Sequence, residues 1–491
     1  MRYDAVIIGA SADGLAAAVL LARKGLKTVV IERGDRPGGL LQTREFHPGF
    51  RASPFADEIA PVPPTIHWEL DLSRRGTDFL PAPCSLAHWP DRQHLLMSYD
   101  ASATNLFLAE VQQIRTQTIS RAEMDVPKQR RWPLFLRYDR AAPWPGRTWS
   151  AETLSGLLQR SLSDDAGSVA HLAAHALAGR TADPFLKGSA LHALAPASGG
   201  SGMITGGLER LADALAAAAR EAGADIRCGL DVSDLKLDNG RIAYATLADG
   251  TEFETRAVIS TFDLKRTFLS LFSWKALPKA VVAQAGTFRV AGASARVLFA
   301  LKARPGSLPP ELLRGPIFVA PRLSRFAEAN LAWRSGNLAS ELPTCLRIVS
   351  VLDPSLAPPG CAVMTATLGS VPFRLFDGAW TKDRRDGLRN RALVAAESVF
   401  PGIAELIIAT DVIAPVDMDN ALGATDGDLW GGEIAADQMF DLRPWSDPPA
   451  PRTPVRGLYL AGPSSPLGPV ATCAAGFLAA KAVLSDAGTG R

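Results

Sequence analysis

The chain has few cysteines, and they stand far apart. They are Cys84, Cys228, Cys345, Cys361 and Cys473, with no CxxC pair among them. This spacing excludes a disulfide scaffold and a cysteine zinc site, and it is typical of a protein in a reducing compartment. His171 and His175 have the i, i+4 spacing of a helical metal site, but two histidines without a third ligand favour a structural role. No metal is therefore expected.

The chain also lacks an excess of one charge and a long apolar run. Its 52 Lys and Arg residues nearly balance its 50 Asp and Glu residues, which gives no general reason to bind nucleic acid. No apolar run reaches the roughly 18 residues of a membrane span. The opening MRYDAVII places an aspartate before the first apolar run, unlike a signal peptide. We expect a cytoplasmic globular protein, long enough for about two or three domains.

The N-terminal segment carries the strongest motif. Residues 5–8 form a short apolar run typical of a buried parallel strand, and a helix is predicted over 15–24. A second strand is predicted over 28–31, directly before Glu32. Strand, turn, helix, strand and acid fit within about 30 residues, which is the size of a dinucleotide-binding βαβ unit.

Each position of this motif has a physical reason. Gly9 allows the sharp turn after the strand, and Gly14 allows the helix to pack against the sheet. The helix N-terminus offers N–H groups to a pyrophosphate, and Glu32 is placed to accept hydrogen bonds from a ribose. The motif departs from GxGxxG at Ser11, where a side chain takes the place of the middle glycine. A small hydroxyl there is expected to fit and to donate to a phosphate.

The nucleotide-binding character returns twice along the chain. A helix is predicted over 208–222, followed by a strand over 225–230, by strands joined through Asn-Gly and Asp-Gly hairpin turns, and by a buried strand over 257–260. The C-terminus has a predicted strand over 457–460 and an apolar helix over 471–484. We therefore expect an α/β protein in which one discontinuous cofactor domain (1–75, 196–275 and 401–491) is interrupted by a substrate domain (76–195 and 276–400).

Four segments together resemble the flavoprotein family of phytoene desaturases, amine oxidases and their relatives, and most of all the phytoene dehydrogenase-like and pyridine nucleotide-disulfide oxidoreductase-domain proteins. They are 4–39, 43–50, 206–268 and 431–462, in the family's order. The resemblance implies a discontinuous Rossmann-type FAD-binding domain with an inserted α+β substrate-binding domain. It also implies an extended FAD, with Glu32 at the adenosine ribose, the backbone of Val232 at the adenine and the final helix pointing its N-terminus at the flavin.

The residues that this resemblance and the motif place at the FAD share one property, since each lies in a glycine-rich turn, beside Glu32 or in the loop after Gly462. They are Gly9, Ser11, Ala12, Asp13, Gly14, Leu15, Glu32, Arg33, Gly38, Gly39, Leu40, Val232, Gly462, Pro463, Gly468, Pro469 and Val470. No catalytic acid–base residue is expected, because a flavin can accept a hydride without one. Arg44, His47 and Cys473 lie in flavin-region segments, although structural roles are favoured for them.

Two stretches depart from the family or stand out from the rest. The loop over 464–473 lacks the histidine and all but one glycine of the family's Thr-His-Pro-Gly-Gly-Gly sequence. Residues 128–149 interleave basic and aromatic side chains, which suits either a surface loop with stacked arginines or contact with an anionic membrane surface, and less well a single-stranded nucleic acid.

The sequence thus predicts an FAD-dependent oxidoreductase that transfers hydride between the flavin and a C–C bond, less readily a C–N bond, of a largely apolar, isoprenoid-like molecule. Peripheral contact with the inner face of a membrane through 128–149 is part of this prediction. The alternatives are a flavoprotein-derived binding or assembly module with weak or lost redox activity, and an amine oxidase with an aromatic cage from Trp430 and Trp445. Substrate, reaction direction, electron acceptor, oligomeric state and protein partners stay open.

Overall fold

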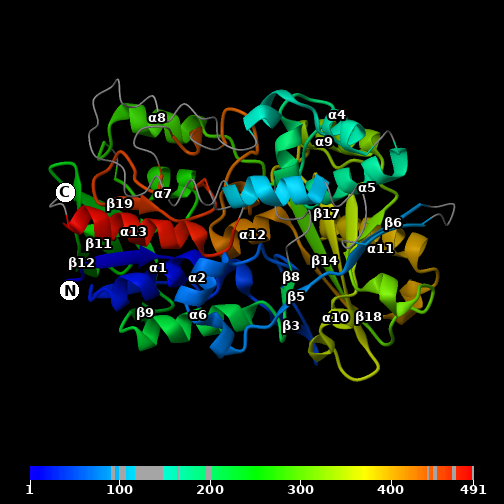
Figure 1. The fold of residues 1–491 in the computed structure, drawn as a ribbon, viewed down its shortest axis with the longest axis horizontal. Coiled ribbons are helices and arrows are strands. Elements are labelled where there is room, and N and C mark those ends of the chain that lie inside the picture. The colour runs from blue at the N-terminus through cyan, green and yellow to red at the C-terminus, as the bar shows by residue number, and fades with distance from the viewer. Residues whose placement is uncertain are drawn as a thin grey trace.

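The computed structural model describes most of the chain. The described residues are 1–89, 94–98, 107–117, 147–162, 165–194, 202–273, 275–439, 442–445, 450–466 and 471–488. Two sheets lie side by side along the long axis of the molecule (Figure 1). The first contains the N-terminal strand, and the second contains strands from the middle of the sequence.

The first sheet has five strands, all parallel to their neighbours. In spatial order they are β19 (Leu458–Leu460), β13 (Ala257–Ser260), β1 (Ala5–Ile8), β2 (Thr28–Ile31) and β9 (Asp225–Arg227). The strands come from three separate stretches of sequence, which is the discontinuous arrangement predicted above. The strand predictions over 5–8, 28–31 and 257–260 match these bounds, whereas β9 ends three residues earlier than expected.

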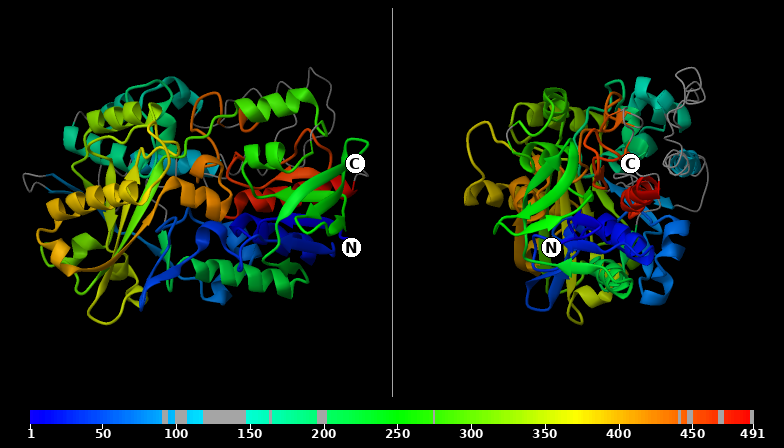
Figure 2. Two further views of the ribbon diagram at one scale, coloured as in Figure 1. Left: turned by 180° about the vertical axis from the view of Figure 1, so that it is seen from behind. Right: turned by 90° about the vertical axis from the view of Figure 1, so that its left-hand side faces the viewer.

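Both faces of the five-stranded sheet are covered, as its continuous apolar strands require. One face packs against helices α1 (Ala12–Arg23), α6 (Glu209–Glu221) and α13 (Ala474–Gly488). The other face packs against a three-stranded antiparallel meander, seen in green at the right of the rear view (Figure 2). The meander contains β10 (Val232–Asp238), β11 (Arg241–Leu247) and β12 (Glu252–Glu254).

The second sheet has seven strands. In spatial order they are β18 (Ile407–Ile413), β14 (Ser294–Leu301), β17 (Ala362–Gly369), β16 (Thr344–Arg347), β15 (Ile317–Val319), β6 (Cys84–His88) and β7 (His94–Ser98). The pair β15 and β6 is parallel, and the other neighbours are antiparallel. This mixed α+β part corresponds to the predicted inserted domain. The boundaries proposed at 75, 195, 275 and 400 stay predictions; β18 lies beyond 400 and still pairs within this sheet.

Apolar side chains on both faces of the seven-stranded sheet are buried. On one face, α11 (Lys382–Val399) packs Leu388 and Ala392 against Val297 and Phe299 of β14. Further helices are α2 (Pro64–Glu69), α4 (Leu154–Ser161), α5 (Ala166–Leu177), α7 (Leu264–Ser270), α8 (Lys279–Thr287), α9 (Leu323–Arg334), α10 (Val349–Leu352) and α12 (Pro415–Leu422), and residues 107–117 are helical as well. Two small antiparallel pairs complete the strands, β3 (Arg44–His47) with β4 (Phe50–Ala52) and β5 (Phe79–Pro81) with β8 (Gly202–Ile204).

Within the described residues, no helix is both long and apolar enough to cross a membrane. Most of the basic and aromatic stretch 128–149 lies outside the described residues. Of its described end, Trp149 is buried, and its ring stacks on Phe107 with the centroids 6.3 Å apart. This tryptophan therefore belongs to the core rather than to an exposed surface.

Candidate functional site

The turn between β1 and α1 is built too tightly for side chains at its glycines. Gly9 has φ +93, and a Cβ there would lie 2.2 Å from Oγ1 of Thr261. A Cβ on Gly14 would lie 2.1 Å from the backbone oxygen of Gly9. Both distances are far below van der Waals contact, so each position requires glycine. The turn consequently leaves the start of α1 open to a ligand at the carboxyl end of β1.

Ser11 has a structural role at the position where the motif departs from glycine. It is the N-cap of α1, and its Oγ accepts a hydrogen bond from the N–H of Gly14 at 3.3 Å. An N-cap residue satisfies one of the free N–H groups of the first turn and typically contributes about 1 kcal/mol to stability. The cap also explains why α1 begins at Ala12 rather than at the predicted residue 15. The hydroxyl hydrogen of Ser11 is not used by this bond and can still be donated.

Glu32 is held in position at the end of β2 by two backbone groups. Its Oε2 accepts from the N–H of Ala10 at 2.7 Å, and its Oε1 accepts from the N–H of Gly34 at 2.8 Å. A carboxylate has about four acceptor positions, so two such bonds leave capacity for ribose hydroxyl groups. The carboxylate is therefore oriented before any ligand arrives.

One pocket joins most of the residues predicted to bind the cofactor. It contains about 1270 Å³ of empty space, part of it open to solvent. Twelve of the predicted residues line it: Gly9, Ser11, Ala12, Asp13, Glu32, Arg33, Gly38, Gly39, Leu40, Val232, Gly462 and Pro463. Gly14 and Leu15 do not line the pocket. Leu15 lies on α1, and its side chain is fully buried in the core. Gly468, Pro469 and Val470 lie outside the described residues.

The pocket wall also includes segments that sequence reasoning missed, at 261–263, 421–424 and 428–429. Asp263 caps α7 and accepts from the N–H of Thr425 at 2.9 Å, which holds the later segments against β13. Arg33 donates to the backbone oxygen of Ala421 at 2.9 Å. The residues 260–268 belonged to the family resemblance and were a usable signal, whereas nothing in the local sequence marked 421–424.

Asp428, in the wall of the pocket, binds three backbone N–H groups through its carboxylate. Its carboxylate accepts from the N–H groups of Ala291 at 2.9 Å, Trp430 at 2.8 Å and Gly432 at 3.0 Å. Burial raises the pKa of Asp428, and the hydrogen bonds from Ala291 and Trp430 oppose that rise. The aspartate thus fixes Trp430 next to the pocket through backbone contacts.

The final helix meets the start of α1 through Asp13. The carboxylate of Asp13 accepts from the N–H of Gly476 at 2.9 Å, in the first turn of α13. A Cβ on Gly476 would lie 1.8 Å from the backbone oxygen of Asp13, so the two helices are in direct backbone contact. Burial raises the pKa of Asp13 to about 7, against the lowering effect of the N–H groups of Gly476 and Ala475. That α13 directs its N-terminus at the flavin stays a prediction.

The comparisons with known proteins agree with this geometry. The family described as DAO, FAD dependent oxidoreductase, matches residues 4–325, which is more than half of the chain. The chain belongs to this family. It is therefore an FAD-dependent oxidoreductase with a Rossmann-type FAD-binding domain and an inserted domain.

Individual relatives of this FAD-dependent oxidoreductase are distant but cover nearly its whole length. The chain is 27% identical to pyridine nucleotide-disulfide oxidoreductase domain-containing protein 2 of Mus musculus, over 99% of this chain and 94% of that protein. It is 23% identical to a lycopene-forming phytoene desaturase of Pseudescherichia vulneris, over 93% and 94%. Among solved structures, a triple mutant of putrescine oxidase aligns with a TM-score of 0.62 at 16% identity, over 99% of each chain. That likeness concerns the fold.

The pocket residues fit an FAD. Glycine at positions 9 and 14 keeps the turn clear of side chains, and the Glu32 carboxylate is oriented for a ribose. The start of α1 supplies backbone N–H groups for a pyrophosphate, and Ser11 supplies an unused hydroxyl hydrogen. Glu32 and Ser11 are therefore the two side chains of this turn that we expect to bond to the cofactor directly.

Other side chains considered from the sequence have structural surroundings. Ser85 Oγ bonds to Nε2 of His171 at 2.9 Å and of His175 at 2.7 Å, which accounts for the paired histidines. Among the described residues, no group of three or more His, Cys, Asp or Glu side chains could hold a metal ion. Cys473 is buried, and burial raises the pKa of its thiol well above the usual value. Arg44 pairs with Asp411 at 2.6 Å.

The two tryptophans considered for an aromatic cage have different neighbours. Trp445 is buried, and its ring meets that of Phe268 edge-on with the centroids 4.9 Å apart. Trp430 has the guanidinium carbon of Arg180 3.8 Å from its ring centroid. Each ring thus already contacts another side chain, and for Trp430 this side chain is the cationic Arg180.

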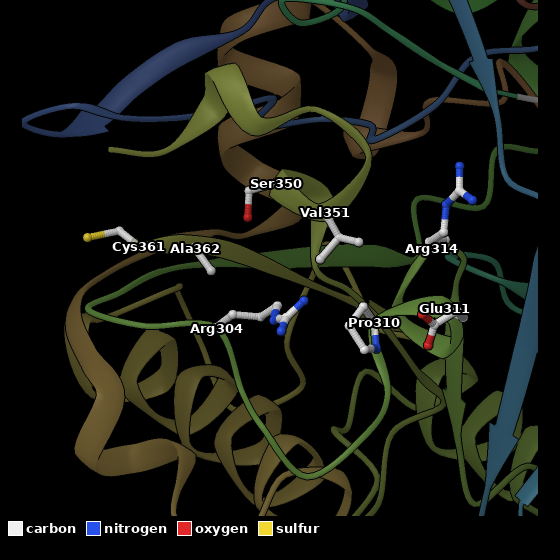
Figure 3. Close-up of a pocket in the computed structure, with 8 residues that line it drawn as sticks. All are labelled: Arg304, Pro310, Glu311, Arg314, Ser350, Val351, Cys361 and Ala362. Carbon is white, nitrogen blue, oxygen red and sulfur yellow. The ribbon is translucent and has the colours of Figure 1, made fainter. Parts of the chain in front are cut away.

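A second hollow lies at the far end of the seven-stranded sheet. Figure 3 shows Arg304 and Arg314 on opposite sides of it, with Ser350, Val351 and Cys361 above Arg304 in this view. Both arginines are exposed, and none of the glycine turns or the Glu32 carboxylate is in its wall. It is therefore not the cofactor site.

Proposed function

We propose that this FAD-dependent oxidoreductase transfers hydride between its flavin and a C–C bond of a largely apolar substrate of isoprenoid type. The phytoene desaturases of Pseudescherichia vulneris and Rhodobacter capsulatus support this proposal, because each aligns with 93% of the chain. Peripheral contact with a membrane surface through 128–149, from which such a substrate would be drawn, remains part of the proposal.

The observation that carries the choice of a C–C bond is the surroundings of Trp430. Arg180 covers its ring at 3.8 Å, and this guanidinium stays charged at neutral pH. A cation at this place repels an amine substrate in its protonated form, and the ring face is not free to form a cage. Both features disfavour action on C–N bonds.

When bound, FAD supplies a ring that accepts or gives a hydride, so the reacting bond needs no titratable protein group. The chain's own residues bind and orient. Glu32 and Ser11 would hold polar groups of the cofactor at the carboxyl ends of β1 and β2. Asp428 lines the pocket, and its carboxylate fixes the backbone of the neighbouring Trp430.

A binding or assembly module that has lost redox activity is the second candidate. Ser11 and the loop over 464–473 favour it, because both depart from the glycines of the family at positions expected to contact the cofactor. The capping bond of Ser11 weakens this candidate, because it gives the serine a role in an intact turn. Restoring glycine in the variants Ser11→Gly and Pro469→Gly tests it: a gain of FAD relative to the wild type would support degeneration, and an unchanged FAD content would support the present loop as adapted.

The proposed reaction is tested with the FAD-loaded protein under anaerobic conditions. Phytoene in detergent micelles and putrescine are added separately, and the flavin band near ~450 nm is followed. Loss of the band with phytoene alone is expected; for the reverse reaction, a reduced flavin is reoxidised by a polyene. Bleaching by putrescine and not by phytoene would replace the proposal with an amine oxidase.

A further inference from the structure

Arg180 is a buried cation whose guanidinium has a hydrogen-bond partner at only one of its three nitrogens. The residue follows α5 and is only 3% exposed. Its Nη1 donates to the backbone oxygen of Ala176 at 2.6 Å and of His192 at 3.3 Å. Its Nε and Nη2 are buried and have no hydrogen-bond partner. These two atoms form one edge of the guanidinium plane, the edge that a carboxylate binds with two parallel hydrogen bonds.

The electrostatic surroundings of Arg180 are basic. Its pKa falls to about 9, first through burial and then through the charge of Arg115, with no acidic group among the causes. His192 lies close by, and burial followed by the charge of Arg180 lowers the pKa of His192 to about 3. His192 is therefore neutral near pH 7 and offers no counter-charge. A buried charge without a partner is costly, so this site has the chemistry of a receptor for an anion.

Three other arginines with little exposure pair with carboxylates, whereas the fully buried Arg443 donates to the backbone oxygens of Gln438, Trp430 and Pro463. Arg296 pairs with Asp57 at 2.5 Å, Arg347 with Glu58 at 2.6 Å, and Arg452 with Asp486 at 2.8 Å. Arg180 has no carboxylate partner among the described residues, and of the described arginines it alone has two buried side-chain nitrogens that lack a hydrogen-bond partner.

Arg180 is connected to the cofactor pocket through Trp430. The ring of Trp430 lies under the guanidinium, and its backbone oxygen accepts from Nη2 of Arg443 at 2.8 Å. The same Nη2 donates to the backbone oxygen of Pro463 at 3.0 Å, and Pro463 lines the cofactor pocket. Asp428, also in the pocket wall, bonds to the N–H of Trp430 at 2.8 Å. The guanidinium of Arg180 is thus linked to the wall of the pocket through Trp430.

We propose that Arg180 binds a carboxylate group of the substrate through Nε and Nη2. This rests on the proposed function and refines it: the substrate is an apolar molecule that ends in a carboxylate, and phytoene in the test above stands for its apolar part alone. Because the free edge is shielded from solvent, the carboxylate displaces side chains that now pack against it, and binding is accompanied by a local rearrangement.

The test uses octanoate as the probe and octanol as its uncharged match, on the full-length protein with and without bound FAD. Octanoate is expected to raise the thermal midpoint of the wild type in a concentration-dependent way, because a ligand that binds the folded state stabilises it. Octanol is expected to leave it unchanged. Arg180→Lys keeps the charge but loses the two-donor edge, so octanoate should bind it about 10- to 100-fold more weakly.

Arg180→Met and Arg452→Met separate binding from a structural role. Removing an unpaired buried cation should leave the midpoint of the ligand-free protein unchanged or raise it, and octanoate should no longer shift it. Arg452→Met strips Asp486 of its buried partner and should lower the midpoint, while the octanoate shift survives. A midpoint of Arg180→Met that falls as far as that of Arg452→Met would overturn the proposal, as would equal shifts with octanoate and octanol.

The readouts also distinguish this proposal from the proposed function. If the protein takes up FAD and phytoene reduces it, but octanoate has no effect, only the carboxylate site fails. If octanoate binds through Arg180 and no FAD is taken up, the redox function fails and the anion site stands as a binding site without it.

Discussion

Asp13 offers a quantitative test of how α1 and α13 are joined. Burial raises its pKa from 3.8 to about 7, so the folded state holds a proton that the unfolded state has lost between these pH values. Stability should therefore fall as pH rises from about 4 to about 7 and level off above. At about 1.36 kcal/mol per pH unit, the full loss is at most about 4 kcal/mol, of which about 2 to 3 kcal/mol falls between pH 5 and pH 8.

The variant Asp13→Asn removes the titration and keeps an oxygen that can accept from the N–H of Gly476. Urea unfolding followed by circular dichroism gives the free energy of unfolding of both proteins at pH 5 and pH 8. The stability of the variant relative to the wild type should rise by about 2 to 3 kcal/mol between the two pH values. Other titrating groups cancel in this difference.

Asp165→Asn is the matched control. Asp165 caps α5, and its hydrogen bonds with Ser168 lower its pKa, which is the opposite direction. Its contribution is present above the unfolded pKa and is lost only in acid, so the difference from the wild type should be constant from pH 5 to pH 8. If Asp13→Asn behaved in the same way, the N–H groups of α13 would hold the Asp13 carboxylate ionised, and the reasoning would be refuted.

Three further predictions concern the glycine turn before α1, the Glu32 carboxylate and the seven-stranded sheet. Gly14→Ala places a Cβ within 2.1 Å of the Gly9 oxygen. The variant should have a lower FAD content, measured by absorbance, and a free energy of unfolding in urea that is lower by about 1–3 kcal/mol. A normal FAD content would contradict the tight turn. Glu32→Ala should weaken FAD about 10- to 100-fold in a fluorescence titration, whereas unchanged affinity would place the ribose elsewhere. Asp57→Ala leaves the buried Arg296 without its carboxylate, so the free energy of unfolding should fall by about 3–5 kcal/mol. A loss below about 1 kcal/mol would contradict the importance of this ion pair.

The sequence was sufficient for the local parts of the fold. The βαβ unit follows from short β-branched strands and from the two glycines, because the whole motif lies within about 30 residues. The errors of the sequence prediction are at the ends of elements. The last helix begins at Ala474 rather than 471 because Cys473 has φ +67, outside the helical region. The predicted strand over 225–230 ends at Arg227, ahead of the left-handed Gly229.

The parts that the sequence did not predict depend on contacts between distant residues. In the seven-stranded sheet, β15 pairs with β6, which precedes it by more than 200 residues. The bond between Asp13 and Gly476 and the stacking of Arg180 on Trp430 likewise join segments with no shared local pattern. Periodicity describes a single element, so it gives no sign that the guanidinium of Arg180 is buried without a carboxylate.

The central claim is that the pocket at the carboxyl ends of β1 and β2 holds FAD. The most direct measurement is the visible absorption spectrum of the purified protein before and after excess FAD is added and removed, for the wild type and for Glu32→Ala. Bands near ~370 and ~450 nm at about one flavin per chain in the wild type, and fewer flavins in Glu32→Ala, are the expected result. A wild-type protein that stays colourless after FAD is added, or a Glu32→Ala protein with the full flavin content, would contradict it.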